Sequence, residues 1–128
     1  MTARVQNNGL ANITAAWVAY ASLPKYLQWG TGSGAAASAN VVTTTTTTEA
    51  RTTGTATQVT TTQTNDTYQV TGTITAAGTR AITEVGVFDA AGTGSPPTGG
   101  NMDIYGDFSV INLATSDSIA FTVKVVFT

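Results

Sequence analysis

The 128-residue sequence predicts an all-β fold, a single jelly-roll-like β-sandwich preceded by an N-terminal arm or short helix. Threonine, valine and glycine dominate the composition, which favours strands over helices. Seven or eight short strand-like segments are separated by turn residues, as in a sandwich, and no fixed repeat period indicates a solenoid. Since 41% of residues are hydrophobic and 9% are charged, the chain can bury one ordinary core.

The chain divides into an N-terminal segment, residues 1–25, and the sandwich domain, residues 26–128. Asn7, Asn8 and Gly9 indicate a turn. Residues 10–23 are the helix candidate, and Pro24 would end that helix. Apolar residues recur there at helical spacing: Leu10, Ile13, Trp17 and Tyr20 or Ala21. Isoleucine, valine and aromatic residues weaken the helical signal, so an extended arm remains the alternative.

The strand candidates differ in the strength of their patterns. Residues 67–75 and 118–128 alternate between polar and apolar side chains, which predicts one buried and one exposed face. Residues 82–88 are apolar enough for a central strand, in which Gly86 indicates a bulge or a close contact. The remaining candidates are residues 25–29, 41–47, 55–62, 103–108 and 110–113.

A threonine-rich tract occupies residues 43–67, where fifteen of twenty-five residues are threonine. The tract lacks proline and almost lacks charge, unlike a mucin-type stalk. Threonine is β-branched and stiff, so the tract is expected to form strands at a sheet edge or a subunit seam. Strands with two polar faces specify their register poorly, and we therefore expect them to need a neighbouring subunit to order fully.

Composition excludes several classes of function. The formal net charge is −2 and the few cations are scattered, so no basic stripe for nucleic acid is expected. No apolar run approaches the ~18 residues needed to cross a membrane. Histidine and cysteine are both absent, which excludes imidazole bases, Cys–His nucleophiles and thiolate metal sites. No enzymatic activity, metal or other cofactor is expected.

The carboxylates are expected to be structural. Most of the aspartates lie in or beside turns, where they cap backbone amides. Asp103 and Asp107 lack the spacing of an EF-hand, and the GTGSG run at residues 30–34 lacks the lysine and helix of a phosphate-binding loop. Glu84 differs, because a carboxylate inside an apolar strand needs a partner. Arg51 or Arg80 could supply it, and an ion pair at a subunit interface is favoured over catalysis.

Four aromatic residues lie close together in the sequence, at positions 17 to 29. A sugar-binding platform is one interpretation, but packing in the core or at an interface is favoured. With the arginine and the glutamate above, they form the set of candidate interface residues: Trp17, Tyr20, Tyr26, Trp29, Arg51 and Glu84.

Five segments carry a resemblance to known proteins: YLQWGTGSG (26–34), NDTYQVTGTIT (65–75), AITEVGVFDA (81–90), GDFSVINL (106–113) and SDSIAFTVKVVF (116–127). In their order they resemble small structural proteins of tailed bacteriophages, including capsid decoration (cement) proteins and some tail-fibre segments. The resemblance indicates a component of the virion more specifically than it indicates which component.

The resemblance to decoration proteins implies a homotrimeric sandwich, made in the host cytoplasm, on the outer surface of the capsid. Such a protein bridges subunits of the major capsid protein and stabilises the mature shell by binding it better than its precursors. The N-terminal segment would then dock on a neighbour. Deletion of residues 1–23 is accordingly expected to abolish capsid occupancy and leave the sandwich folded.

Three other interpretations remain open. A tail-fibre or tail-tip module for host attachment is the first, and copy number per virion distinguishes it from a lattice component. An ice-binding protein is the second, although its Thr-x-Thr pairs lack the regular period that would align the hydroxyls. A glycan hydrolase built on Glu84 is the third.

Overall fold

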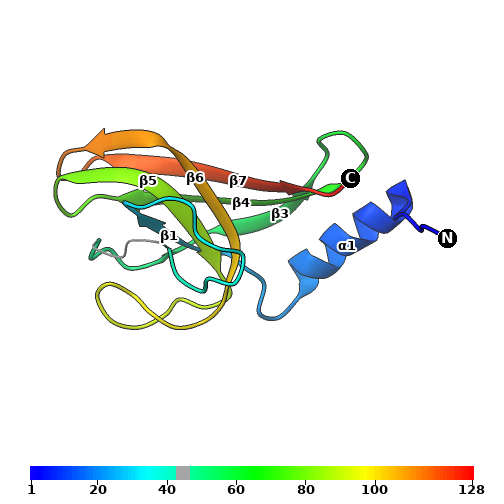
Figure 1. Ribbon diagram of the computed structural model, residues 1–128, viewed down its shortest axis with the longest axis horizontal. Helices are drawn as coiled ribbons and strands as arrows, with labels where there is room; N and C mark the ends of the chain where they lie inside the picture. The colour runs from blue at the N-terminus through cyan, green and yellow to red at the C-terminus, as the bar shows by residue number, and fades with distance from the viewer. Residues whose placement is uncertain (43–46) are drawn as a thin grey trace.

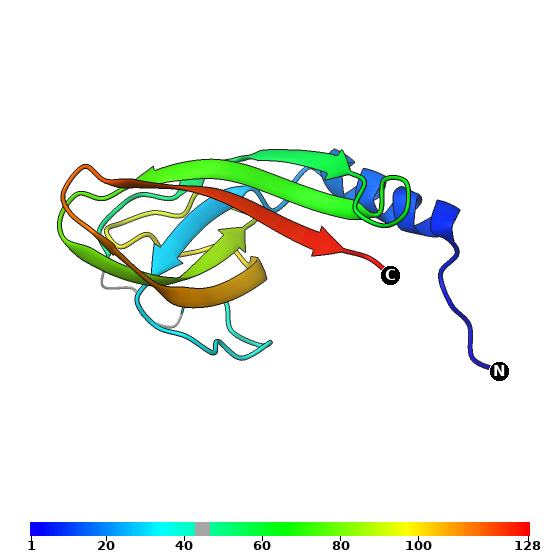
Figure 2. The same ribbon diagram turned by 90° about the horizontal axis from the view of Figure 1, so that it is seen from above.

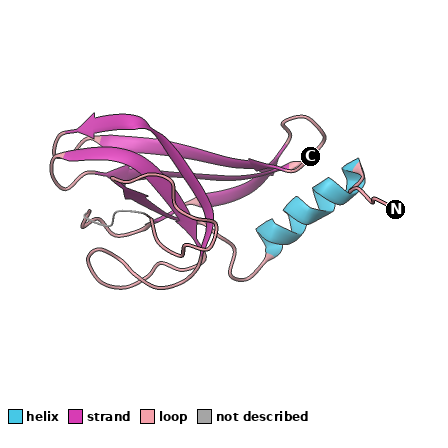
Figure 3. Cartoon of the chain, viewed as in Figure 1, coloured by secondary structure: helices cyan, strands magenta, loops and turns pink. Residues whose placement is uncertain are grey.

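The computed structural model describes residues 1–42 and 47–128. Its elements in chain order are α1 (Asn7–Ala19), β1 (Tyr26–Gly30), β2 (Thr52–Thr53), β3 (Thr55–Val59), β4 (Thr67–Thr75), β5 (Arg80–Phe88), β6 (Met102–Leu113) and β7 (Ser118–Val126). The strands form two antiparallel sheets, in the orders β2-β1-β5-β6 and β3-β4-β7. The sheets pack against each other, with α1 at one end (Figures 1 and 3). The predicted all-β sandwich with an N-terminal helix is confirmed.

The core lies between the two sheets. Alternate residues of β4 and β7 face it, so the period-two patterns of residues 67–75 and 118–128 mark the buried faces as predicted. The buried hydrophobic residues of this core are Leu27, Trp29, Tyr68, Val70, Ile74, Ala76, Ile82, Val85, Val87, Leu113 and Phe121. Thr71, Thr73 and Thr75 alternate with these core residues and lie on the outer face, whereas Thr67 is buried.

Strand β6 is a single strand, whereas the sequence predicted two strands over residues 103–113. It pairs with β5 along its length, and the pairing shifts register between Ile82 and Glu84 and again between Val87 and Phe88. Bulges absorb such irregularity without ending a strand. The predicted close contact at Gly86 is confirmed, because a Cβ atom there would lie 2.7 Å from the sulfur of Met102.

The threonine-rich tract contributes strands to both sheets. Strand β2 belongs to one sheet and β3 to the other, with only Gly54 between them. A Cβ atom at Gly54 would lie 2.8 Å from the carbonyl oxygen of Thr71, so glycine alone fits this crossing. The strand candidate at residues 41–47 lies partly outside the described residues, and its described members Val41, Val42 and Thr47 belong to no strand.

Helix α1 begins and ends earlier than the sequence predicted. The predicted turn at residues 7–9 is wrong, because these residues form the first helical turn. The backbone is already extended at Tyr20, so the helix ends at Ala19, five residues before Pro24. Its covered face agrees with the predicted apolar set only in part: Leu10 is buried and Trp17 packs against the core, but Ile13 and Tyr20 are exposed. The polar residue Thr14 is buried in their place.

The helix is anchored to the β3-β4-β7 sheet. The ring of Trp17 lies 4.6 Å from that of Tyr68, centroid to centroid, and 5.9 Å from that of Phe127. The Thr14 hydroxyl donates a hydrogen bond to the Asn65 carbonyl at 2.6 Å. Removal of residues 1–23 would therefore uncover the fully buried Tyr68, so the deletion is no longer expected to leave the sandwich intact.

Truncation of the Trp17 side chain should destabilise the whole domain. We expect Trp17→Ala to lower the free energy of unfolding by about 2–4 kcal/mol, because the indole packs on Tyr68 and Phe127. Urea denaturation followed by circular dichroism measures the change. The matched control is Tyr20→Ala, at the residue that directly follows the helix, where the side chain is 58% exposed and a change of about 0.5 kcal/mol or less is expected. Equal losses in the two variants would contradict this account of the helix.

Candidate interface at the N-terminal helix

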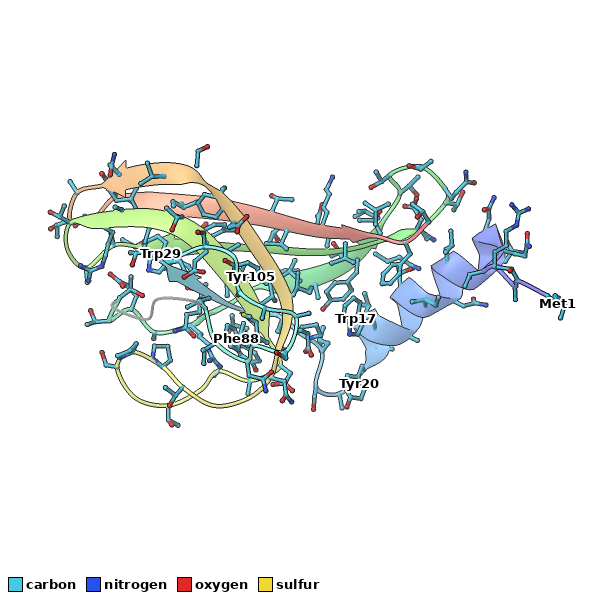
Figure 4. The ribbon with its side chains drawn as sticks, in the orientation of Figure 1. Met1, Trp17, Tyr20, Trp29, Phe88 and Tyr105 are labelled. Carbon is cyan, nitrogen blue, oxygen red and sulfur yellow. The ribbon has the colours of Figure 1, made fainter. Side chains whose placement is uncertain are left out.

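An apolar groove lies between α1 and the C-terminal end of the chain. It has a volume of about 470 Å³ and is lined by Ile13, Ala16, Trp17, Tyr20 and Phe127. Ala16 and Trp17 lie three and four residues after Ile13, which places all three on one stripe of α1, and Tyr20 caps the end of the helix beside them. Tyr20 stands at the C-terminal end of this stripe, away from the sandwich (Figure 4). We call this surface the helix groove.

A second groove of about 440 Å³ adjoins the helix groove and shares Phe127 with it. It lies between the N-terminal arm and the loop after β3, with Arg4, Leu10 and Gln63 among its lining residues. The arm residues 1–6 are all exposed. The second groove has a mixed lining with one cationic side chain, Arg4, and one carboxylate side chain, Asp66, so the apolar part of this end of the molecule is the helix groove.

The aromatic residues that are close in sequence separate in the structure. Trp17 and Tyr20 both line the helix groove. Trp29 is 1% exposed and lies in the core, where its indole N–H donates to Glu49 Oε2 at 3.3 Å. Tyr26 is half-buried on β1 with Lys25 Nζ 5.7 Å from its ring centre. The chain between α1 and β1 thus divides the predicted cluster into a surface pair and a pair within the sandwich.

Arg51 is buried over the outer face of the β2-β1-β5-β6 sheet. Its guanidinium lies 3.6 Å from the ring centroid of Phe88, a cation–π contact. The Nε–H group donates to Gln28 Oε1 at 2.8 Å, and Nη1 donates to the carbonyls of Ala90 and Gly99 at 2.9 and 2.7 Å. Arg51 therefore fastens the long loop after β5 onto the sheet, and at 7% exposure it presents almost no surface to a partner.

Asp89 closes the same loop. Its carboxylate accepts hydrogen bonds from the backbone and side-chain N–H groups of Asn101 at 2.7 and 2.9 Å. These bonds lower the pKa of Asp89, with burial opposing them and the charge of Arg51 adding to them. Burial lowers the pKa of Arg51, and the charge of Asp89 acts in the opposite direction. The expected role of turn aspartates as amide acceptors is confirmed here.

Glu84 is fully buried on β5. Its Oε1 accepts from the Gly32 N–H at 3.1 Å, and its Oε2 accepts from the Tyr105 hydroxyl at 2.8 Å. Asp107, its register partner on β6, accepts from the Gly34 N–H at 2.9 Å. The carboxylates of Glu84 and Asp107 thus hold the 30–34 loop in place. The backbone N–H groups of Gly32 and Gly34 bind these carboxylates and not a phosphate.

The arginine partner expected for Glu84 lies elsewhere. Arg80 Nε forms an ion pair with Glu49 Oε1 at 3.0 Å. Glu49 Oε1 also accepts from the Ala77 N–H at 2.9 Å. Burial alone would raise the pKa of Glu49, but these hydrogen bonds, that from Trp29 and the charge of Arg80 outweigh it, and the pKa is lowered. Sequence reasoning missed this pair because no local pattern links residues 49 and 80.

Comparisons with protein-family models, curated proteins and solved structures gave no match to this chain. Across residues 1–42 and 47–128, no three acidic, histidine or cysteine residues gather where they could hold a metal ion. The described part of the chain has no helix both long and apolar enough to span a membrane. The features that bear on function are those of the chain itself, above all the helix groove.

Asp66 organises the loop on which α1 rests. Its carboxylate accepts from the backbone N–H groups of Thr61, Thr62 and Gln63 at 2.9, 3.0 and 2.7 Å, and from the Thr67 hydroxyl at 2.8 Å. The bond from Gln63 is the largest cause of a pKa well below the ordinary range, with burial opposing it. Asn65 lies in the turn that precedes this aspartate and has a φ of 57°.

Acid should destabilise the protein through Asp66. Because its pKa is lower in the folded state, the stabilisation is fully present above the unfolded pKa of ~3.9 and is lost as the pH falls through and below that value. We expect the midpoint of urea denaturation to fall progressively below about pH 5. Asp66→Asn removes an acceptor oxygen, so it should lower stability at pH 7 and flatten this acid dependence. Identical pH profiles for the two proteins would contradict the assignment.

Proposed function

We propose that this chain is a non-enzymatic capsid decoration (cement) protein of a tailed bacteriophage. In this role it binds the outer surface of the mature head and bridges subunits of the major capsid protein. Two lines of reasoning support the proposal: the sequence resemblance across residues 26–128, and a β-sandwich whose N-terminal helix leaves an apolar stripe uncovered. The helix groove is the observation on which the docking role depends.

The helix groove has the properties of a protein–protein docking site. Contiguous exposed apolar patches commonly mark such sites. The stripe is held in place because Trp17 packs on Tyr68 and because Gln58 Nε2 donates to the Ala11 carbonyl at 2.7 Å. A preorganised surface loses little conformational entropy on binding. We therefore assign contact with the capsid subunit to Ile13 and Tyr20, which are 39% and 58% exposed.

The outer face of the β3-β4-β7 sheet is suited to packing against an uncharged surface of a partner. The outer face of the β3-β4-β7 sheet carries a cross-strand row of Thr55, Thr71 and Thr122. Short neutral hydroxyls lose little side-chain entropy and carry no charge to desolvate. A homotrimer on the capsid, which the resemblance implies, is part of the proposal. Stabilisation of the shell then equals the difference in binding free energy between the mature lattice and its precursors.

Copy number in purified virions tests the proposed location. Quantitative mass spectrometry should find this protein at hundreds of copies per particle, as a lattice component requires. A few to a few dozen copies would instead support the tail-fibre or tail-tip alternative. Absence from the particle would overturn both.

Substitution of the exposed stripe tests the docking surface. We expect Ile13→Ser combined with Tyr20→Ser to weaken binding to mature heads stripped of this protein by about 10- to 100-fold or more, because apolar and aromatic anchors dominate such interfaces. The unfolding midpoint should change little, since both side chains are exposed. Val41→Ser, at a site 48% exposed and outside both grooves, is the matched control and should bind as the wild type does. Unchanged binding by the double variant would contradict the assignment.

A further inference from the structure

Three of the four sheet edges carry a feature that blocks pairing with another chain. Edge strands are commonly protected by short length, charge, bulges or a covering element. Strand β2 has two residues, and the five-residue β3 is contacted by α1 through the bond from Gln58 to the Ala11 carbonyl. Strand β6 carries Asp103 and Asp107, and its pairing with β5 is irregular.

Strand β7 carries almost none of these features. Its sequence, SIAFTVKVV, contains no proline, glycine or carboxylate, and Lys124 is its only charge. It pairs with β4 in unbroken register over nine residues, and no described strand pairs with its other edge. The strand runs along the outside of the molecule (Figure 2). Such a long, regular edge is a template for backbone hydrogen bonding.

Apolar residues accompany this free edge. A groove of about 320 Å³ runs beside β7 and is lined by residues of both sheets, including Val85, Phe108, Phe121 and Val123. Ile111 on the rim is 39% exposed. The sandwich is therefore open on the β6–β7 side, where core residues reach the surface.

We propose that β7 pairs antiparallel with β7 of a second copy of this chain, about a two-fold axis at Thr122. In this register all nine residues of the strand find a partner, and each pair has residue numbers that sum to 244. Phe121 faces Val123 of the second copy, and Ile119 faces Val125. Apolar residues thus meet apolar residues on the inner face. On the outer face Thr122 meets Thr122 of the second copy, Ala120 meets Lys124 and Ser118 meets Val126.

Charge excludes one competing register of β7 and disfavours self-pairing of β6. Pairing about Thr122 places Lys124 opposite Ala120 of the second copy, so the two ammonium groups stay apart. Pairing centred on Lys124 would place them directly opposite each other, which is unfavourable. Self-pairing of β6 would bring together strands that each carry Asp103 and Asp107. A two-fold contact of this kind is self-complementary and closes without forming a fibre.

The pairing would join two three-stranded sheets into one continuous sheet across the axis. It would also cover the β7 side of the groove. The surface it uses is distinct from the helix groove, so the inference does not rest on the proposed function. A two-fold contact is compatible with capsid docking through α1 and with a three-fold contact made by other surfaces.

Charge variants at Ala120 test the register. Ala120 is exposed and faces Thr73 within its own sheet, so substitution there should leave the monomer folded. Ala120→Lys places a like charge opposite each Lys124 and should raise the dimer dissociation constant between about twofold and 30-fold. Ala120→Glu supplies an opposite charge at the same positions and should lower it by a similar factor. Sedimentation equilibrium at low salt measures both.

A single cysteine tests the position of the axis. The chain has no cysteine, so Thr122→Cys introduces the only thiol. Residues facing each other across antiparallel strands lie ~4.5–5.5 Å apart between Cα atoms, within the range of a disulfide. Oxidation should convert Thr122→Cys to a covalent dimer much faster than Thr57→Cys, an exposed control on β3 of the same sheet. Circular dichroism verifies that each variant is folded.

The outcomes separate this inference from the proposed function. A wild-type dimer, opposite shifts in the two Ala120 variants and selective cross-linking at position 122 support pairing through β7. A wild-type monomer, or an oligomer insensitive to Ala120 and not cross-linked through position 122, overturns it. Either overturning result leaves capsid binding through Ile13 and Tyr20 untouched, because that binding is measured separately.

Discussion

The buried ring of Tyr68 is the contact on which the organisation of this protein depends. It is a core residue of β4, its ring packs against that of Trp17 of α1, and its hydroxyl donates to the Pro24 carbonyl at 2.6 Å. One side chain thus joins the helix, the linker and the sandwich. Burial, with a contribution from the charge of Asp103, raises the pKa of Tyr68 to about 12, so the phenol remains a neutral donor across the physiological range. The helix groove has a defined shape because this contact holds α1 in place.

The two proposed surfaces follow from two different departures from a closed sandwich. The helix groove exists because α1 rests on the sheet with one stripe and leaves another bare. The β7 edge exists because the sandwich is open on one side, so that backbone groups and core side chains both reach the surface. Phe127 follows β7 directly and lines the helix groove, so both surfaces lie along the same part of the chain. Burial of either surface by a partner would remove apolar side chains or unpaired backbone groups from water, which is the physical basis of both proposals.

The polar interior shows where residue-by-residue reasoning succeeds. The expectation that turn aspartates cap backbone amides holds for Asp66 and Asp89, and for Asp117, which accepts from the Ala114 N–H at 2.8 Å. For Asp66 and Asp117 the amides lie three to five residues away, and for Asp89 they lie at the other end of the same loop, so each aspartate acts within one turn or loop. Glu49 and Glu84 differ because their partners lie far away in sequence. Arg51 likewise contacts both the sheet and a loop that is distant in sequence. Neither its hydrogen-bond partners nor its burial can therefore be predicted from the residues around position 51.

The sequence by itself determined the fold class, the strands at residues 67–75 and 118–126, and the face that each turns to the core. These follow from a period of two, which needs no knowledge of the neighbouring strand. Tertiary structure decided the covered face of α1, the continuity of β6, the crossing of the threonine tract at Gly54 and the separation of Trp17 and Tyr20 from Trp29. Threonine-rich strands have no apolar face from which the buried side could be predicted. A helix with apolar residues on two stripes could pack on the sheet with either stripe. These features depend on contacts between segments that are far apart in the chain, and such contacts exist only in the folded structure.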